Sequence, residues 1–341
     1  VYKRQDLMSI HVWRQTQTQS TIINFYEEDM NIFNPRRNDR GDTEGVFRME
    51  FPLMQWLVAC LYKIFGNHLI ITRIFMFFVG LLSIFGIYKL LNVLFQNNTL
   101  AVFGAWAFNF SPSFYYYTIN PLPDNLALCC SIWGIALFFA WSKNKKTYNL
   151  IFSSLLLSIG ALCKLPFIIY FIIPFSYFVF VFFKKGLNKK MLFQSILAHV
   201  FSILPIVWYL TVIPKWGHNP VVKGMLGNSK PIAQLFNFLQ YNFFSTLPEL
   251  LLNYGSVIFF LAGFYFLFKN KSYKDSKFVP LLSLSVMTLV YFFFEINAIA
   301  KIHDYYLFPF YPLLFILVAY GAFNMYKSKA KFYKYLTITL L

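Results

Sequence analysis

The sequence predicts an all-α protein whose helices cross a membrane many times. Of its 341 residues, 58% are hydrophobic and only 13% are charged, which is more apolar surface than a soluble domain of this length can bury. Apolar runs of roughly 17–25 residues, the length that a bilayer requires, recur along the chain. Most lysines gather in short connections between those runs. The predicted fold class is therefore a polytopic transmembrane helix bundle with about nine complete spans.

A long polar segment, from His11 to Phe51, precedes the spans. It holds seven of the thirteen acidic residues and five arginines, so we expect it to lie in water beside the membrane. The apolar spacing from Thr16 to Met30 predicts a short amphipathic helix. The stretch from Phe51 to Phe65 repeats apolar residues at helical spacing but is too short to span a bilayer, which predicts a helix in the interface plane. Residues 1–68 form the predicted first outer loop.

The spans follow this loop. We expect them at about residues 69–95, 100–118, 124–141, 148–164, 166–183, 191–213, 251–269, 278–296 and 305–325. A further apolar run opens near Tyr333 and stops at Leu341. The predicted division is an outer loop at 1–68, a bundle at 69–325 with a second outer loop at 214–250, and a cytoplasmic loop with the start of a truncated span at 326–341. An outer segment as large as 1–68 needs a preceding helix, so we expect the chain to be a fragment at both ends.

The lysines predict the orientation. The connections at 142–147, 184–190, 269–277 and 326–334 carry fifteen lysines and one acid, Asp275. The positive-inside rule places these connections in the cytoplasm and the polar segments 1–68 and 214–250 on the extracytoplasmic face. The abundance of Phe, Tyr, Ile, Lys and Asn is typical of an AT-rich bacterial genome. We therefore expect a multi-pass protein of the inner, or plasma, membrane of a bacterium.

Several function classes are disfavoured by composition and motifs. The net charge of +17 would suggest nucleic acid in a soluble protein, but the position of the lysines indicates membrane topology, so no nucleic-acid partner is expected. Cys60, Cys129, Cys130 and Cys163 all fall in apolar runs and are interpreted as buried thiols. The glycine-rich loops of soluble nucleotide-binding proteins are absent, which argues against an NTP-driven pump.

Three short motifs carry a family resemblance: His11-x-Trp13-Arg14-Gln15, Glu50-Phe51-Pro52-Leu53, and Pro123-Asp124 at the start of a span. Together with the order of loops and spans, they resemble the type-C glycosyltransferase superfamily. The nearest branch is the protein O-mannosyltransferase and aminoarabinose transferase group. The resemblance implies that the chain moves a sugar, with inversion, from a polyprenyl-phosphate carrier to an acceptor lipid, glycan or protein at the outer face.

The resemblance also implies catalytic residues. It places a catalytic Asp in an Asp-Glu-x-Arg motif, and aligning Arg14 with that Arg puts His11 where the Asp belongs. A histidine can accept a proton near neutral pH, so His11 is the candidate base, with Asp6 as a fallback and a solvated loop histidine as the alternative. Asp124 is implied as an acceptor- or metal-binding residue, and a plain helix N-cap is its alternative. Glu50 is implied near the donor phosphate or the acceptor, or is simply a helix-start acid.

Other residues are candidates for binding the donor. Arg14 and Trp13 could bind a phosphate and stack on a sugar, with ion pairing in the loop as the alternative. Lys164 is a candidate for the carrier phosphate, although snorkelling to lipid headgroups would also explain it. His303 and Tyr305 are donor-side candidates, and an interfacial aromatic belt is the alternative for the tyrosine.

The cofactor and the competing functions stay open. Some members of the superfamily use a divalent cation and others do not, so Mg²⁺ or Mn²⁺ bound at Asp124 is an option rather than a requirement. A transporter or flippase of a lipid-linked glycan is the second hypothesis. It predicts ionisable groups at span centres and broken helices in two related halves, whereas this chain concentrates its acids in outer loops. A structural protein would not need His, Asp, Glu and Arg on one face.

Overall fold

The structure, a computed structural model, describes residues 10–186, 188–216, 224, 230–275 and 277–340, and these are helical for most of their length. The α-helices are α1 (Val12–Glu27), α2 (Leu53–Phe65), α3 (Leu69–Phe95), α4 (Asn98–Asn109), α5 (Pro112–Tyr117), α6 (Pro123–Asn144), α7 (Thr147–Cys163), α8 (Ile172–Lys185), α9 (Lys189–His199), α10 (Ile203–Val212), α12 (Ile232–Tyr241), α13 (Gly255–Lys269), α14 (Phe278–Phe294), α15 (Ile296–Ile299), α16 (Tyr311–Tyr326) and α17 (Lys331–Leu340). The predicted all-α fold class is confirmed. Asp6, the fallback carboxylate, lies outside the described residues.

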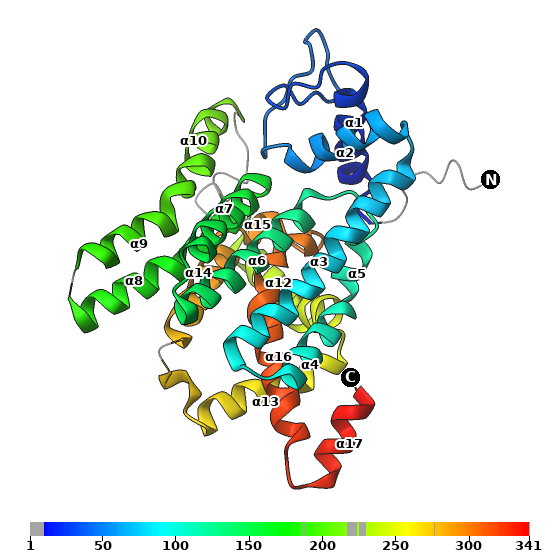
Figure 1. The fold of residues 1–341 in the computed structure, drawn as a ribbon. Coiled ribbons are helices and arrows are strands. Elements are labelled where there is room, and N and C mark those ends of the chain that lie inside the picture. The colour runs from blue at the N-terminus through cyan, green and yellow to red at the C-terminus, as the bar shows by residue number, and fades with distance from the viewer. Residues whose placement is uncertain (1–9, 187, 217–223, 225–229, 276, 341) are drawn as a thin grey trace.

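The segment predicted as the first outer loop contains the two helices that its sequence predicts. Helix α1 starts and ends a few residues earlier than the predicted stretch from Thr16 to Met30. Its apolar face, with Ile22 and Phe25, packs against Val58 and neighbouring residues of α2, and these helices lie at the top of Figure 1. In α2 the buried and exposed positions alternate at helical spacing, so one face packs against α1 and α3 while Phe65 stays exposed. Its position in a membrane interface remains a prediction.

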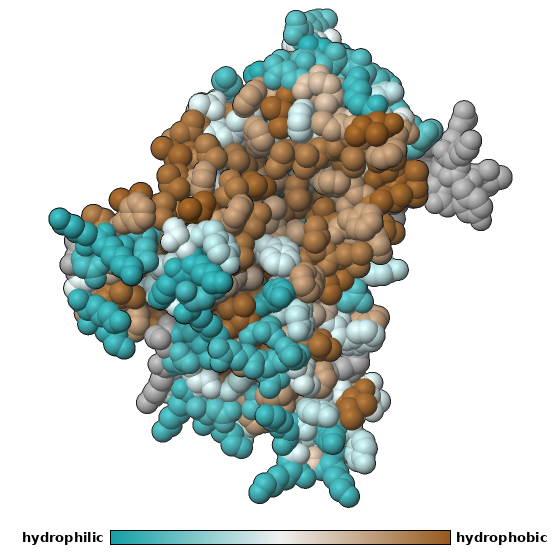
Figure 2. All heavy atoms as spheres, viewed as in Figure 1, coloured by the Kyte–Doolittle hydropathy of each residue, from teal (hydrophilic) through white to brown (hydrophobic). Residues whose placement is uncertain are grey.

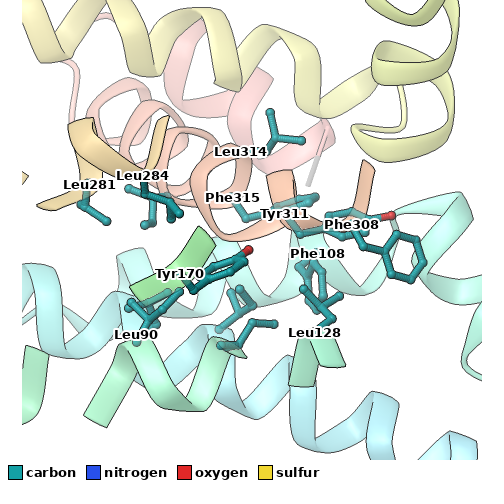
Figure 3. Close-up of a cluster of buried hydrophobic side chains, with 14 of the residues drawn as sticks. Leu90, Phe108, Leu128, Tyr170, Leu281, Leu284, Phe308, Tyr311, Leu314 and Phe315 are labelled. Atoms are coloured by element: carbon teal, nitrogen blue, oxygen red, sulfur yellow. The ribbon is translucent and has the colours of Figure 1, made fainter. Parts of the chain in front are cut away.

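The bundle closes around one large hydrophobic core. Figure 3 shows Phe108 of α4 meeting Tyr311 and Phe315 of α16. Helices α13 and α16 cross closely at Gly263 and Gly321. The approach is so close that a Cβ atom on Gly321 would overlap the carbonyl oxygen of Phe259. Small residues at such a crossing allow two backbones to approach inside a membrane. This packing holds α16 in the bundle, and the residues of the site described below, His303 to Tyr305, lie just before this helix.

Five described helical segments are long and apolar enough to cross a membrane. They are Leu69–Phe95, Pro123–Asn144, Leu165–Lys185, Lys189–Trp216 and Asp304–Tyr326. A sixth span results if Ile232–Leu251 and Gly255–Lys269, which meet at 110°, are one broken span. Thr147–Cys163 and Phe278–Phe294 are shorter apolar helices. The chain is thus an integral membrane protein, and the number of nine spans remains a prediction.

Two predicted spans differ from the structure. Residues 100–118 form two helices, α4 and α5, rather than one, because Pro112 has no backbone N–H and Ser111 before it is extended. The span expected at 251–269 begins at Gly255, after the π-helix η6 (Asn242–Leu251). The segment predicted as the second outer loop is helical over α12 and η6, and its residues 217–223 and 225–229 lie outside the described residues.

The surface agrees with a membrane protein that has two polar ends. Figure 2 shows an apolar band below the hydrophilic cap formed by the first loop, with hydrophilic side chains again toward the lower side. Exposed side chains such as Ile74, Phe78 and Leu82 of α3 contribute to the apolar surface. The connections α8–α9, α13–α14 and α16–α17, three of the four lysine-rich ones, lie away from α1 and α2 in Figure 1. This arrangement is the one that the positive-inside rule requires.

Candidate functional site

Backbone contacts bring Glu50 to the corner between α7 and the 3₁₀-helix η2 (Leu165–Phe171). The N–H of Phe51 donates a hydrogen bond to the carbonyl oxygen of Leu162 over 2.9 Å. The indole Nε1 of Trp208 donates to the carbonyl oxygen of Met49 over 3.0 Å. These two bonds hold the polypeptide on either side of Glu50, so its carboxylate faces Lys164 although 114 residues separate the two.

Four charged side chains from distant parts of the chain meet at this corner. Glu50 Oε1 accepts hydrogen bonds from Arg14 Nη2 at 2.7 Å and from Lys164 Nζ at 2.9 Å. Lys164 Nζ also lies 3.5 Å from Asp124 Oδ1. We call Arg14, Glu50, Lys164 and Asp124 the inner ion cluster. It contains two cations and two carboxylates, and the exposed fractions of their side chains lie between 1% and 13%.

The cations keep Glu50 ionised despite its burial. Burial alone would raise the pKa of the Glu50 carboxyl, but the charges of Arg14 and Lys164 outweigh it and hold the pKa well below its ordinary value of 4.5. A carboxylate that two cations stabilise this strongly is a poor proton acceptor at neutral pH. Glu50 is therefore better suited to orienting Arg14 and Lys164 than to general base catalysis.

Asp124 lies in the first turn of α6, directly after Pro123, and is almost fully buried. The N-cap residue of this helix is Leu122, and no side chain caps it. The alternative of a plain N-cap is therefore not what the structure shows. Oδ1 of Asp124 faces Lys164, and its buried Oδ2 has no hydrogen-bond partner.

His11 forms a second centre beside the inner ion cluster. It is 8% exposed and adopts a left-handed backbone conformation, with φ of 58°, just before α1. Its Nε2 lies 3.6 Å from Asp304 Oδ1. The ring stacks on His303 with centroids 5.3 Å apart and meets the edge of Tyr305 at 5.0 Å. A left-handed non-glycine residue is strained, and such strain is common at functional sites.

Tyr305 joins the two centres. The ammonium of Lys164 lies 5.6 Å from the centroid of the Tyr305 ring, and this ring also contacts His11. The sequence thus predicted a set of residues that the structure brings together, with one exception. The indole of Trp13 is 59% exposed and lies outside both centres, so stacking on a sugar there would require a substrate that extends over α1.

The contacts of His303 suit packing better than phosphate binding. Its Nδ1 lies 2.6 Å from the carbonyl oxygen of Ala298, which can only accept, so Nδ1 carries the proton. Burial lowers the pKa of His303 below its ordinary value of 6.5, so the ring is neutral at pH 7. Nε2 of a neutral ring protonated at Nδ1 can only accept a hydrogen bond. It therefore offers no proton to a phosphate oxygen.

An apolar cavity of about 260 Å³ opens beside Lys164 and Glu50. Its walls are mainly apolar and aromatic, and they are formed by Met49, Leu165, Pro166, Ile168, Ile169, Tyr209, Trp216, Met287, Val290, Tyr291, Phe294 and Tyr306, together with Glu295. A smaller cavity of about 40 Å³ also borders Met49 and Glu50, and its mixed lining includes Arg14, Gln17 and Gln55 together with apolar residues. Met49 and Glu50 therefore border both cavities.

The sequence did not single out two acids of this region. Asp304 follows His303 in the sequence, but no local pattern marks it, because only the fold brings it to His11. Glu295 is 7% exposed, lines the apolar cavity, and has an unpartnered Oε2. Burial raises its pKa to about 7. An isolated acid at the end of an apolar run gives no signal in sequence that could have identified it.

The donor set does not fit a divalent metal at Asp124. The described residues contain no group of three or more His, Cys, Asp or Glu that could hold a metal ion. The Lys164 ammonium lies between Asp124 and Glu50, where it would repel a second cation. Mg²⁺ prefers a near-octahedral shell of oxygen atoms, and Asp124 offers only its Oδ2, because Oδ1 faces the ammonium of Lys164.

Comparisons with known proteins identify the fold. Residues 50–209 match the family model described as dolichyl-phosphate-mannose-protein mannosyltransferase. The structure is similar to that of ArnT from Cupriavidus metallidurans, with a TM-score of 0.63 in the apo state and 0.65 in the complex with undecaprenyl phosphate, at 14% identity. The chain has the type-C glycosyltransferase fold. The resemblance that the motifs predicted is thereby confirmed.

The type-C fold extends over nearly the whole chain but only part of the solved proteins. Both ArnT structures align with 98% of this chain, which spans 59% of their length. The archaeal oligosaccharyltransferase AglB from Archaeoglobus fulgidus, in complex with an inhibitory peptide and a dolichol-phosphate, has a TM-score of 0.56 at 12% identity. That match covers 98% of this chain and 51% of AglB. No curated protein sequence matches the chain.

Proposed function

We propose that the protein is a glycosyltransferase that moves a hexose or pentose, with inversion, from a polyprenyl-phosphate carrier to an acceptor lipid, glycan or protein. One observation carries the proposal: Lys164, held between two buried carboxylates, lies at the wall of the apolar cavity. A polyprenyl phosphate needs an apolar wall for its tail and a cation for its phosphate, and this cavity offers both within one space.

The comparisons support a carrier of this class. One ArnT structure holds undecaprenyl phosphate, the AglB complex holds a dolichol-phosphate, and the matched family model is described by dolichyl-phosphate-mannose. All three are polyprenyl phosphates or sugars linked to them. The fold similarity aligns nearly the whole of this chain with such proteins. A carrier of the same chemical class is therefore the donor that we propose here.

The geometry suggests a division of roles. Lys164 and Arg14 neutralise the charge that the departing phosphate gains, and Glu50 and Asp124 hold Lys164 in place. Since both carboxylates contact this ammonium, they lie on the phosphate side of the reaction. Inversion requires the acceptor to attack from the opposite side, so we assign the base to His11, beyond the Tyr305 ring.

The location follows from the same site. The inner ion cluster is built from the predicted first outer loop and from span ends near it, whereas three of the four lysine-rich connections lie away from α1 and α2 (Figure 1). The proposed active site therefore faces the extracytoplasmic side of the inner, or plasma, membrane of a bacterium.

The decisive experiment uses the protein in membrane vesicles with a radiolabelled polyprenyl-phosphate sugar. Wild type is compared with Lys164→Ala and His11→Ala, and with Asp42→Asn in the exposed part of the first loop as the matched control. We expect wild type and the control to release the sugar from its carrier, with losses of roughly 10²-fold or more in the two site variants.

Two outcomes would contradict the proposal. The transferase proposal fails if wild type turns over none of a panel of hexose, pentose and aminosugar carriers. If the labelled carrier instead moves between leaflets without cleavage, the transporter hypothesis replaces it.

The cavity is tested separately with Ile168→Trp, which fills the apolar space and should weaken donor binding while Lys164 keeps its partners.

A further inference from the structure

His11 stands where the resemblance implies an aspartate, and a carboxylate from the far end of the chain faces it. Asp304 Oδ1 lies 3.6 Å from His11 Nε2, although 293 positions separate the two residues in sequence. We propose that Asp304 is a positioning residue that acts through His11, so that the two residues together replace the single carboxylate that the resemblance implies at this place. This inference rests on the proposed function.

Asp304 is held so that it can serve this purpose. The hydroxyl of Tyr117 donates a hydrogen bond to Oδ1 over 3.0 Å, and the hydroxyl of Ser113 donates to Oδ2. Both donors belong to α5, which follows the break at Pro112, whereas Asp304 opens the 3₁₀-helix η8 (Asp304–Phe310). Two neutral donors fix the carboxylate without neutralising its charge. That charge remains available to a cationic imidazole.

His11 is held as firmly from the other sides. His303 stacks on one face of the ring, and the edge of Tyr305 closes another side. Nε2 is buried and lacks a hydrogen-bond partner, and the nearest charged atom to it is Asp304 Oδ1. A separation of 3.6 Å is an ion-pair distance slightly beyond a hydrogen bond, and such contacts tighten when the reacting complex forms. We assign the proton of neutral His11 to Nε2, since the carboxylate faces that nitrogen.

This assignment leaves the lone pair of Nδ1 to accept a proton. The acceptor oxygen forms a bond to the anomeric carbon of the sugar, and its proton passes to Nδ1. The bond from the anomeric carbon to the phosphate oxygen breaks, and the polyprenyl phosphate leaves with the electron pair. His11 is now a cation on both nitrogens, and the Asp304 carboxylate stabilises it. Release of that proton to water restores the neutral ring.

The other groups around His11 cannot take over this role. His303 is neutral at pH 7, because burial lowers its pKa. Tyr305 and Tyr117 present neutral phenols, and the Lys164 cation lies beyond the Tyr305 ring. Glu50 and Asp124 are both engaged with Lys164. Among the described residues that contact His11, Asp304 therefore supplies the negative charge.

The test compares wild type with Asp304→Asn, Asp304→Glu and the exposed-loop control Asp42→Asn. We expect Asp304→Asn to lower kcat roughly 10–100-fold with the KM for the donor within twofold, because the base is affected and the phosphate site is not. The acidic limb of the pH–rate profile should move to lower pH, since protonated His11 loses its stabilising charge. Asp304→Glu should restore part of the rate and should return the acidic limb part of the way to its wild-type position.

A second measurement does not depend on turnover. Hydrogen–deuterium exchange at C2 of His11, followed by mass spectrometry across pH, reports the midpoint at which this ring takes up a proton. We expect the midpoint to fall in Asp304→Asn and to stay unchanged in Asp42→Asn. If Asp304→Asn left both the midpoint of His11 and the acidic limb of the pH–rate profile unchanged, the pairing of His11 with Asp304 would be overturned. A shifted midpoint in a protein that turns over no donor would support the pairing and overturn the proposed function.

Discussion

Two groups of ion pairs in the first outer loop and its surroundings show how burial changes the role of the same residue types. The inner ion cluster joins Arg14, Glu50, Lys164 and Asp124 from four separate elements. The second group, which we call the loop ion cluster, joins Glu28 to Arg36 at 3.0 Å and to Arg40, and Arg36 to Glu44 at 3.9 Å.

The two clusters differ in exposure and in sequence distance. Glu44 of the loop cluster is 84% exposed, and its four members lie within 17 positions of one another. The inner cluster spans 151 positions, and Asp124 is 1% exposed. Exposed pairs are screened by water and salt and stabilise a fold little. Buried charges have lost their hydration, so each depends on its partner, and a charged ligand that enters alters the whole cluster.

Removal of Lys164 is the strongest test of this difference. Lys164→Met leaves Glu50 and Asp124 buried without the ammonium between them, which should lower the free energy of unfolding by about 3–5 kcal/mol. The loop counterpart Arg36→Met should change it by no more than about 1 kcal/mol. Thermal unfolding in detergent measures both. Lys164→Arg keeps the charge and should recover most of the stability. Equal losses of unfolding free energy in Lys164→Met and Arg36→Met would remove the distinction between the clusters.

The next effect is a dependence of stability on pH. The folded pKa of Glu50 lies below 4.5, so its ionised form contributes stability that is present above the unfolded value and is lost as the pH falls toward the folded one. We expect wild type to lose more stability than Glu50→Gln between pH 5 and pH 3, in unfolding curves recorded at matched salt. Glu28→Gln, its exposed counterpart, should follow the wild-type curve closely. A wild-type curve parallel to that of Glu50→Gln would show that Glu50 is not held ionised by Arg14 and Lys164.

The two clusters also mark the limit of what the sequence could predict. The spans, the first-loop helices and the candidates His11, Glu50, Asp124 and Lys164 follow from hydropathy and from short motifs. The break of the predicted span 100–118 at Pro112 could have been predicted from the proline alone. The contacts of Glu50 with Lys164 and of His11 with Asp304 could not, because they depend on how α5, α6, α7 and η8 pack. No local pattern encodes a contact across 114 residues.

A moderate effect is expected at His303, where charge and packing can be separated. His303→Phe keeps a ring on the face of His11 and should retain turnover within about threefold, because the native ring is neutral at pH 7. His303→Ala opens that face and should lower turnover roughly 10-fold by loosening His11. Initial rates over a range of donor concentrations measure both, and they separate kcat from the KM for the donor. If His303→Phe were as impaired as His303→Ala and the defect were in the KM for the donor, His303 would be a phosphate ligand after all.

The smallest effect is expected from metal removal, and it separates the two clusters once more. In the inner cluster an ammonium already lies between the carboxylates, so EDTA should leave turnover by wild type within about twofold. The acids of the loop are exposed and could bind a divalent cation weakly without consequence for the site. The assay adds EDTA, then excess Mg²⁺ or Mn²⁺, with Lys164→Arg as the matched variant. If EDTA abolished turnover and Mn²⁺ restored it, Asp124 would be a metal ligand. Lys164 would then have to leave its position between Asp124 and Glu50 when the metal binds.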